Sequence, residues 1–285
     1  MRLLFLRARG PLRFFKRVRI GLRLFKQSIA TIVFDHHRYF LFCTLLALVR
    51  FFRIQLISFI DPQFSISYAV TESLMGQSFF TILFSKQEVV RTFNGILIFI
   101  IKIALFYLEL FITFSLMGAV TYYTFYSKRV TFFESIQQSF KQWKKISIWA
   151  CSELTILFIT SLLGILGDFL EFGWSLSTAL VISLIMFEPL PFKTLIKDTF
   201  ILFKQRFGNI VGTEVFTESA LIVLTFLFYY LYRDQQTPLF DFLQPTQLHS
   251  LTLIVLFYLN SVIVVTETIT FTLLYKIIVS RKSHS

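Results

Sequence analysis

The sequence predicts an all-α fold: a polytopic helical membrane bundle of six transmembrane helices, with three amphipathic helices at the cytoplasmic interface. The first observation is composition, because 55% of the 285 residues are hydrophobic and only 15% are charged, far from what a soluble core requires. The second is the length of the apolar runs, which suffices to cross a ~30 Å hydrocarbon layer. Since the runs lack alternating polarity, and lipid cannot satisfy backbone polar groups, helices are favoured over barrel strands.

The apolar runs define the expected spans and the domain organisation. A basic tail with an amphipathic helix occupies residues 1–38, and the six-helix transmembrane domain occupies residues 39–285. The N-terminal arginines interrupt any early apolar stretch, so we expect the tail to be retained and not cleaved as a signal peptide. The predicted spans cover residues 39–60, 94–123, 146–167, 173–190, 208–232 and 250–276.

The distribution of Lys and Arg predicts the orientation. These residues concentrate in the N-terminal tail, in segments 128–145 and 193–206, and at the C-terminal end. The connections on the other side carry few of them, and cytoplasmic loops are the ones enriched in Lys and Arg. Both termini are therefore expected in the cytoplasm.

An internal repeat relates residues of about 131–190 to residues of about 191–250. The segment FFESIQQSFKQWKK, which begins at Phe132, is matched sixty residues later, and Ser139 is answered by Thr199. Each copy has apolar residues at three- to four-residue spacing, with Lys and Gln on other faces, and precedes an outward-going span. This is typical of an amphipathic helix lying in the membrane interface. The matched pairs are Phe132 and Phe192, Ile136 and Ile196, Phe140 and Phe200, Trp143 and Phe203, and Lys144 and Lys204.

A third segment, at residues 13–32, has the same pattern and also leads into an outward-going span. Basic residues on these three helices are expected to bind the lipid bilayer through its anionic lipids, and nucleic acid is not an expected partner. The residues expected at the lipid surface are Arg13, Lys16, Arg17, Arg23, Lys141, Lys144, Lys145, Lys193 and Lys197.

The longest outer connection, residues 61–93, contains an apolar stretch at residues 74–84 that is too short to cross the membrane. A short amphipathic helix that covers the bundle and a re-entrant segment are both compatible with it. Its role stays open.

Three motifs carry a resemblance to a family. They are the FKQWKK end of the first repeat copy, the junction Glu188-Pro189-Leu190-Pro191-Phe192, and the FKQRFGN end of the second copy. Together they resemble a domain-of-unknown-function family of bacterial six-helix membrane proteins, and more remotely the membrane domain of some glycerophosphodiester phosphodiesterases, over about residues 90–230. The soluble phosphodiesterase barrel is absent, so that activity is not implied. The resemblance implies a bacterial inner (plasma) membrane location.

Ionisable residues within the predicted spans are the candidates for function, because a charge at the bilayer centre costs ~2.5–3.5 kcal/mol even on insertion scales. One interpretation is a polar cavity in which carboxylates titrate or hold a cation, with an arginine as counter-ion. The other is internal pairing of Arg50 and Arg53 with carboxylates and of Lys102 with Glu109. The candidates are Arg50, Arg53, Lys102, Glu109, Glu153, Glu214, Glu218 and Glu267.

No motif for an enzyme, a metal site or a cofactor is present. The sequence lacks GxSxG, HExxH, a CxxC pair and a phosphate-binding glycine loop. We therefore expect no catalytic residue, metal or cofactor. The leading hypothesis is a non-enzymatic integral membrane protein that interacts with lipid or acts as a scaffold at the cytoplasmic leaflet. The alternative is a small ion- or proton-coupled transporter or channel that uses the buried carboxylates.

Overall fold

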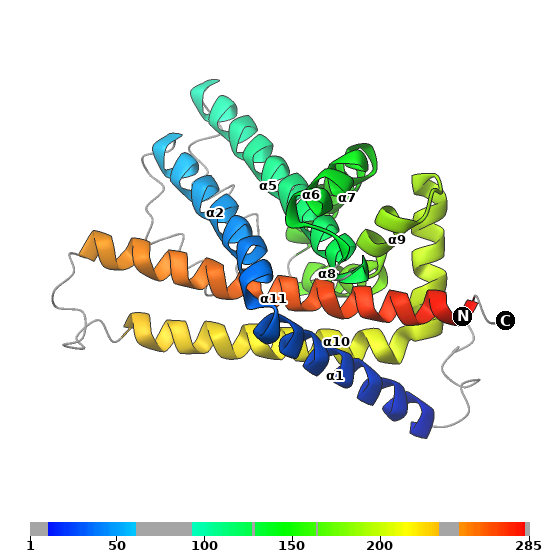
Figure 1. Cartoon of the computed structure of the whole chain (residues 1–285). Helices are drawn as coiled ribbons and strands as arrows, with labels where there is room; N and C mark the ends of the chain where they lie inside the picture. Colours follow the sequence, from blue (N-terminus) through cyan, green and yellow to red (C-terminus); the bar gives the residue numbers. More distant parts are fainter. Residues whose placement is uncertain (1–10, 61–92, 127–128, 164, 234–244, 283–285) are drawn as a thin grey trace.

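The computed structural model describes residues 11–60, 93–126, 129–163, 165–233 and 245–282 (Figure 1). No strand occurs in these ranges, so the predicted all-α class is confirmed for the described chain. The outer connection 61–92 lies outside the described residues. The helices are α1 (Pro11–Phe34), α2 (His36–Ile60), α5 (Phe93–Tyr126), α6 (Phe132–Lys141), α7 (Trp143–Leu162), α8 (Ile165–Thr178), α9 (Val181–Phe187), α10 (Phe192–Arg233) and α11 (Pro245–Lys282).

Four stretches of the described helices are long and apolar enough to cross a membrane, which indicates an integral membrane protein. They are His37–Ile60, Ile96–Tyr126, Phe169–Phe187 and Ile254–Ser280. The most apolar window of α5 is only 17% buried inside the protein, so most of this helix is free to face lipid. The predicted spans 146–167 and 208–232 are not among the four.

Three helix boundaries differ from the sequence-based expectation. Helix α7 ends at Leu162, and the N–H of its C-cap Leu163 donates to the Thr160 carbonyl. Gly167 then approaches α7 so closely that a Cβ there would lie 1.7 Å from the Thr160 oxygen, so the α7–α8 turn falls earlier than predicted. The predicted span 173–190 consists of the end of α8 and all of α9. Residues 192–233, expected as an interfacial helix and a separate span, form one helix that bends in Figure 1.

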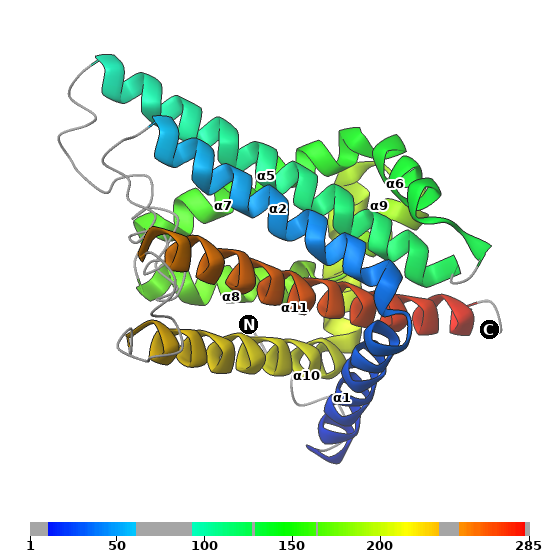
Figure 2. The ribbon, with the colours of Figure 1, turned by 60° about the vertical axis from the view of Figure 1, so that its left-hand side comes forward.

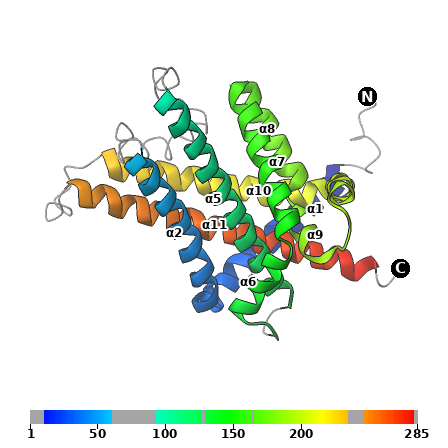
Figure 3. The ribbon, with the colours of Figure 1, turned by 90° about the horizontal axis from the view of Figure 1, so that it is seen from above.

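The long helices pack in a ring. Contacts join α2 to α5, α5 to α7, α7 to α8, α8 and α9 to α10, α10 to α11, and α11 back to α2. Figure 3 shows α10 beside α11 and α7 beside α8. The left side of Figure 2 holds the end of α2, the start of α5, the α7–α8 turn, the end of α10 and the start of α11. The right side holds α6 and the end of α11. The long helices therefore alternate in direction along the chain.

Two apolar clusters hold the ring together. One joins α7, α9, α10 and α11 and includes the fully buried Ile146, Leu180 and Leu195. The other joins α2, α5 and α11 around Phe42 and Ile269. Because lipid tails are as apolar as these side chains, close packing, and not exclusion from water, stabilises such clusters in a membrane.

Helix α6 begins at a capping box. The Thr131 N–H donates to the Glu134 carboxylate at 2.7 Å, and the Glu134 N–H donates to the Thr131 hydroxyl. The first of these hydrogen bonds lowers the pKa of Glu134 below its ordinary value. The box ends the loop after α5 and defines where α6 begins.

Candidate functional site: a cationic helix face and an intramembrane charge cluster

Helix α1 is seated on α10 through glycines. A Cβ at Gly21 would lie 2.4 Å from the Asn209 carbonyl oxygen, and a Cβ at Gly212 would lie 2.8 Å from the Val18 carbonyl oxygen. Both contacts are with backbone atoms, so neither neighbour moves easily. Gly208 and Gly212 form a GxxxG pattern, which permits close helix approach in membranes. This pattern is present in the sequence and predicts such a contact, although it does not identify the partner helix.

A buried hydroxyl pair joins α1 to α11. The Thr270 hydroxyl donates to the Ser28 hydroxyl at 2.8 Å, and the Ser28 hydroxyl donates to the Leu24 carbonyl. Ser28 and Thr270 are fully buried. Helix α1 is therefore held against the bundle along one face and does not lie apart from it.

The remaining faces of α1 are exposed and divided by chemistry. At about 100° per residue, four exposed apolar side chains fall on one stripe and four basic ones on the adjacent stripe, whereas the exposed Phe14 and Phe34 lie off the apolar stripe. Next to the headgroup region of a membrane, the first stripe suits acyl chains and the second suits phosphates. The apolar stripe comprises Phe15, Leu22, Ile29 and Val33, and the basic stripe comprises Lys16, Arg19, Arg23 and Lys26. Arg17 is also exposed, and the side chain of Arg13 lies outside the described residues.

The other residues expected at the lipid surface fall into two groups. Lys141, Lys144, Lys193 and Lys197 are exposed, and the Lys144 ammonium lies 5.7 Å from the centroid of the exposed Trp143 ring. The fifth residue, Lys145, is only partly exposed, because its ammonium donates to the Glu188 carbonyl at 3.0 Å. That carbonyl belongs to the C-cap of α9, so Lys145 has a structural partner at a helix C-terminus.

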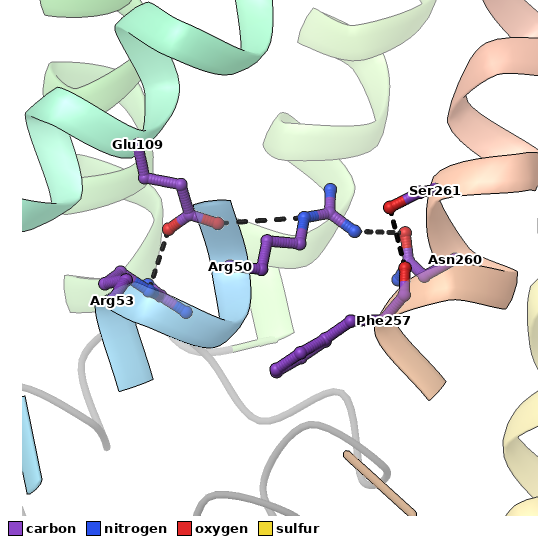
Figure 4. A network of polar contacts seen from close by, with 6 residues as sticks. All are labelled: Arg50, Arg53, Glu109, Phe257, Asn260 and Ser261. Carbon is purple, nitrogen blue, oxygen red and sulfur yellow. Dashed lines mark hydrogen bonds and ion pairs between the residues drawn. The ribbon is translucent and has the colours of Figure 1, made fainter. Parts of the chain in front are cut away.

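Three of the intramembrane candidates come together between α2 and α5 (Figure 4). Arg53 Nε lies 2.8 Å from Glu109 Oε2, and Arg50 Nε lies 3.7 Å from Glu109 Oε1. Arg50 Nη1 also donates to Asn260 Oδ1 of α11 at 2.5 Å. We name these four residues the charge cluster. Its three charged side chains are 11–19% exposed.

The charge cluster is incompletely hydrogen-bonded. Within the described part of the chain, Arg53 Nε, Arg53 Nη1 and Glu109 Oε2 are buried and make no hydrogen bond, so the 2.8 Å contact is an ion pair whose N–H is poorly aligned. The Arg53 guanidinium lies 4.4 Å from the centroid of the Phe106 ring, a cation–π contact. Two guanidiniums thus share one carboxylate, which leaves a surplus of positive charge and of donors.

The other candidates are placed elsewhere. Lys102 is buried on α5, and Glu267 is partly buried on α11. Glu153 of α7 accepts a 2.9 Å hydrogen bond from the Trp174 indole of α8. The side chains of Glu214 and Glu218 lie outside the described part of α10.

Sequence reasoning missed Asn260 and Trp174, the neutral partners of the ionisable groups. An asparagine within an apolar run is a signal that could have indicated Asn260. Trp174 carried no such signal, because a tryptophan near a span end is ordinarily an interface residue.

Comparison with protein-family models, with curated proteins and with solved structures found no match to the chain. Within the described ranges, no group of three or more His, Cys, Asp or Glu residues is arranged to hold a metal ion.

Proposed function

We propose that the chain is a non-enzymatic integral membrane protein that binds anionic lipid at the cytoplasmic leaflet, as a lipid-organising or scaffolding protein. The observation that carries this proposal is the exposed double stripe of α1. A helix docked by Gly21, Leu24 and Ser28 cannot turn its basic residues inward to find protein partners. It presents them beside an apolar stripe, as binding at a charged lipid surface requires.

The proposal includes a finer topology. Six crossings, with both termini in the cytoplasm, put α1, α6 and the start of α10 on the same side of the membrane. The alternating helix directions in Figure 2 support this arrangement. A bacterial inner membrane and membership of the six-helix family described above are parts of the same proposal, and they rest on the resemblance.

The second candidate is a small ion- or proton-coupled transporter or channel. One observation favours it, namely the surplus of positive charge and donors in the charge cluster. Against a role for Glu109 as the ion-binding group, this carboxylate is already in contact with two arginines. Under this alternative, Glu218 or Glu267 is the group that binds and releases the ion or proton. Replacing the responsible residue with Gln would then abolish flux in a protein that still folds.

The lipid proposal is tested with the full-length protein in mild detergent, by measuring the affinity for phosphatidylglycerol and for phosphatidylcholine. We expect a preference for the anionic lipid that weakens with salt. The variant Lys16→Gln/Arg19→Gln/Arg23→Gln/Lys26→Gln should lose most of this preference, since each basic residue contributes ~1 kcal/mol.

The matched control is Lys16→Arg/Lys26→Arg, which retains the charge of the stripe and should behave as the unmodified protein. Equal affinity for the two lipids, or an unchanged preference in the fourfold variant, would contradict the proposal.

A further inference from the structure

We propose that the charge cluster of Arg50, Arg53, Glu109 and Asn260 is an intramembrane binding site for a monovalent anion, a halide or a carboxylate. This inference does not depend on the lipid proposal, because it concerns a different part of the molecule.

The cluster has more cationic than anionic groups. A guanidinium keeps its charge in proteins, and within the described part of the chain Glu109 is the one carboxylate in contact with Arg50 and Arg53. The third partner, Asn260, is an amide and carries no charge. A net positive charge in surroundings of low dielectric is unfavourable unless an anion compensates it.

The hydrogen-bonding capacity of the two guanidiniums is not filled by the described residues. Among these residues, Arg53 Nη1 has no acceptor, Arg53 Nε has only the poorly aligned contact with Glu109, and Arg50 Nε is 3.7 Å from its carboxylate oxygen, beyond hydrogen-bond length. The guanidiniums therefore have donors to offer, whereas the carboxylate and the Asn260 oxygen are the acceptors joined to the arginines in Figure 4. An anion supplies acceptors without adding donors.

An anion must be able to reach the cluster from outside the protein. The three charged side chains come from α2 and α5, and Asn260 comes from α11, so the cluster lies where three helices meet. The side chain of Arg50 is 19% exposed, and those of Arg53 and Glu109 are each 11% exposed. The side chains are therefore partly exposed, whereas Arg53 Nε and Nη1 are themselves buried, so binding of an ion requires these side chains to move.

The ligand class follows from charge and shape. One negative charge neutralises the cluster, whereas a doubly charged anion would reverse its sign. The planar guanidinium donates two parallel hydrogen bonds to a carboxylate, and it also binds a halide.

The test uses the purified full-length protein at constant sodium concentration and ionic strength, with gluconate replaced stepwise by chloride or by acetate. The apparent unfolding temperature is followed at each step. We expect a saturable rise for the small anions, because a ligand that binds only the folded protein stabilises it. If chloride and acetate behave as gluconate does throughout the titration, the proposal fails.

Two substitutions should move the anion affinity in opposite directions. Glu109→Gln removes the internal competitor and should tighten binding at least tenfold. Arg53→Gln leaves a neutral cluster and should weaken binding at least tenfold. The control Lys197→Gln removes an exposed charge on α10 and should change nothing.

A purely structural ion pair gives a different result: both cluster variants lose stability, and neither shows a saturable anion effect that differs from that of Lys197→Gln. That result overturns the proposal. If Arg53→Gln fails to fold, Arg53→Lys replaces it, because lysine keeps the charge but lacks the planar guanidinium. The direction in which Glu109→Gln changes the anion affinity then decides whether the proposal holds.

Discussion

At the scale of single residues, Gly21 determines how closely α1 approaches α10. A methyl group there would meet the Asn209 carbonyl oxygen at 2.4 Å, and the helix backbone cannot yield cheaply. We expect Gly21→Ala to reduce the free energy of unfolding by about 1–3 kcal/mol. Thermal unfolding of the purified protein in detergent measures the loss.

The matched control is Gly173→Ala, because nothing lies within 4 Å of the Cβ position at Gly173. Gly173 is also within a helix, where Ala is favoured over Gly by up to ~1 kcal/mol. The control should unfold at the same temperature or a higher one. A similar loss in both variants would show that the Gly21 contact is not tight.

The charge cluster shows what sequence can and cannot predict for single residues. The spacing of Arg50 and Arg53 placed them on one helix face, and their pairing with a carboxylate was one of two interpretations. The pairing of Glu109 with these arginines depends on how α2 and α5 are rotated, which local pattern does not encode. Lys102 lies ~10.5 Å along the helix axis from Glu109, too far for an easy ion pair.

At the scale of elements, α1 is a docked helix. The hydroxyls of Ser28 and Thr270 are 2.8 Å apart, close enough for cysteines at these positions to form a disulfide. In a background without Cys43 and Cys151, we expect Ser28→Cys/Thr270→Cys to crosslink under mild oxidation. The crosslink is measured with a maleimide that retards the protein on a gel. A disulfide protects both thiols from this reagent, so the crosslinked protein is not retarded.

The control pair is Leu22→Cys/Thr270→Cys, since Leu22 lies on the exposed apolar stripe. It should remain reduced under the same conditions. Equal crosslinking of the two pairs would mean that α1 rotates or moves along the membrane surface instead of resting against α11.

Sequence periodicity anticipated the helical segments better than their ends. Ser139 and Thr199, matched by the repeat, are both almost fully buried, and Phe140 and Phe200 are exposed to similar extents, 48% and 43%. The helix ends were harder to predict, because no proline separates residues 192–207 from 208–232 and Gly208 lies inside the continuous helix α10. The repeat itself stays a prediction.

At the scale of the whole molecule, the alternating directions of the long helices divide the connections between two sides, and the Lys and Arg distribution predicts which side is cytoplasmic. Cysteines introduced at Lys141 or Lys197, in the background without native cysteines, should be inaccessible to a membrane-impermeant maleimide in intact cells. Permeabilised cells should show labelling at both positions. Labelling of intact cells would mean that the orientation is inverted or that the number of crossings is not six.

Composition was sufficient to predict the all-α class and the membrane environment, because lipid leaves few backbone solutions for apolar runs of this length. The closed ring could not be predicted. It depends on contacts between helices far apart in the chain, such as α11 with α2, and these are determined by side-chain shape, not by hydropathy.

The packing of α1 against α10 and α11 affects the order in which the protein assembles in the membrane. This segment leaves the ribosome before α2 to α9, and the two helices against which it packs, α10 and α11, follow them in the chain. Until α10 and α11 insert, the side of α1 that carries Gly21 lacks the helices against which it packs. Docking of α1 therefore follows the insertion of α10 and α11, and a chain truncated before α10 would leave α1 undocked.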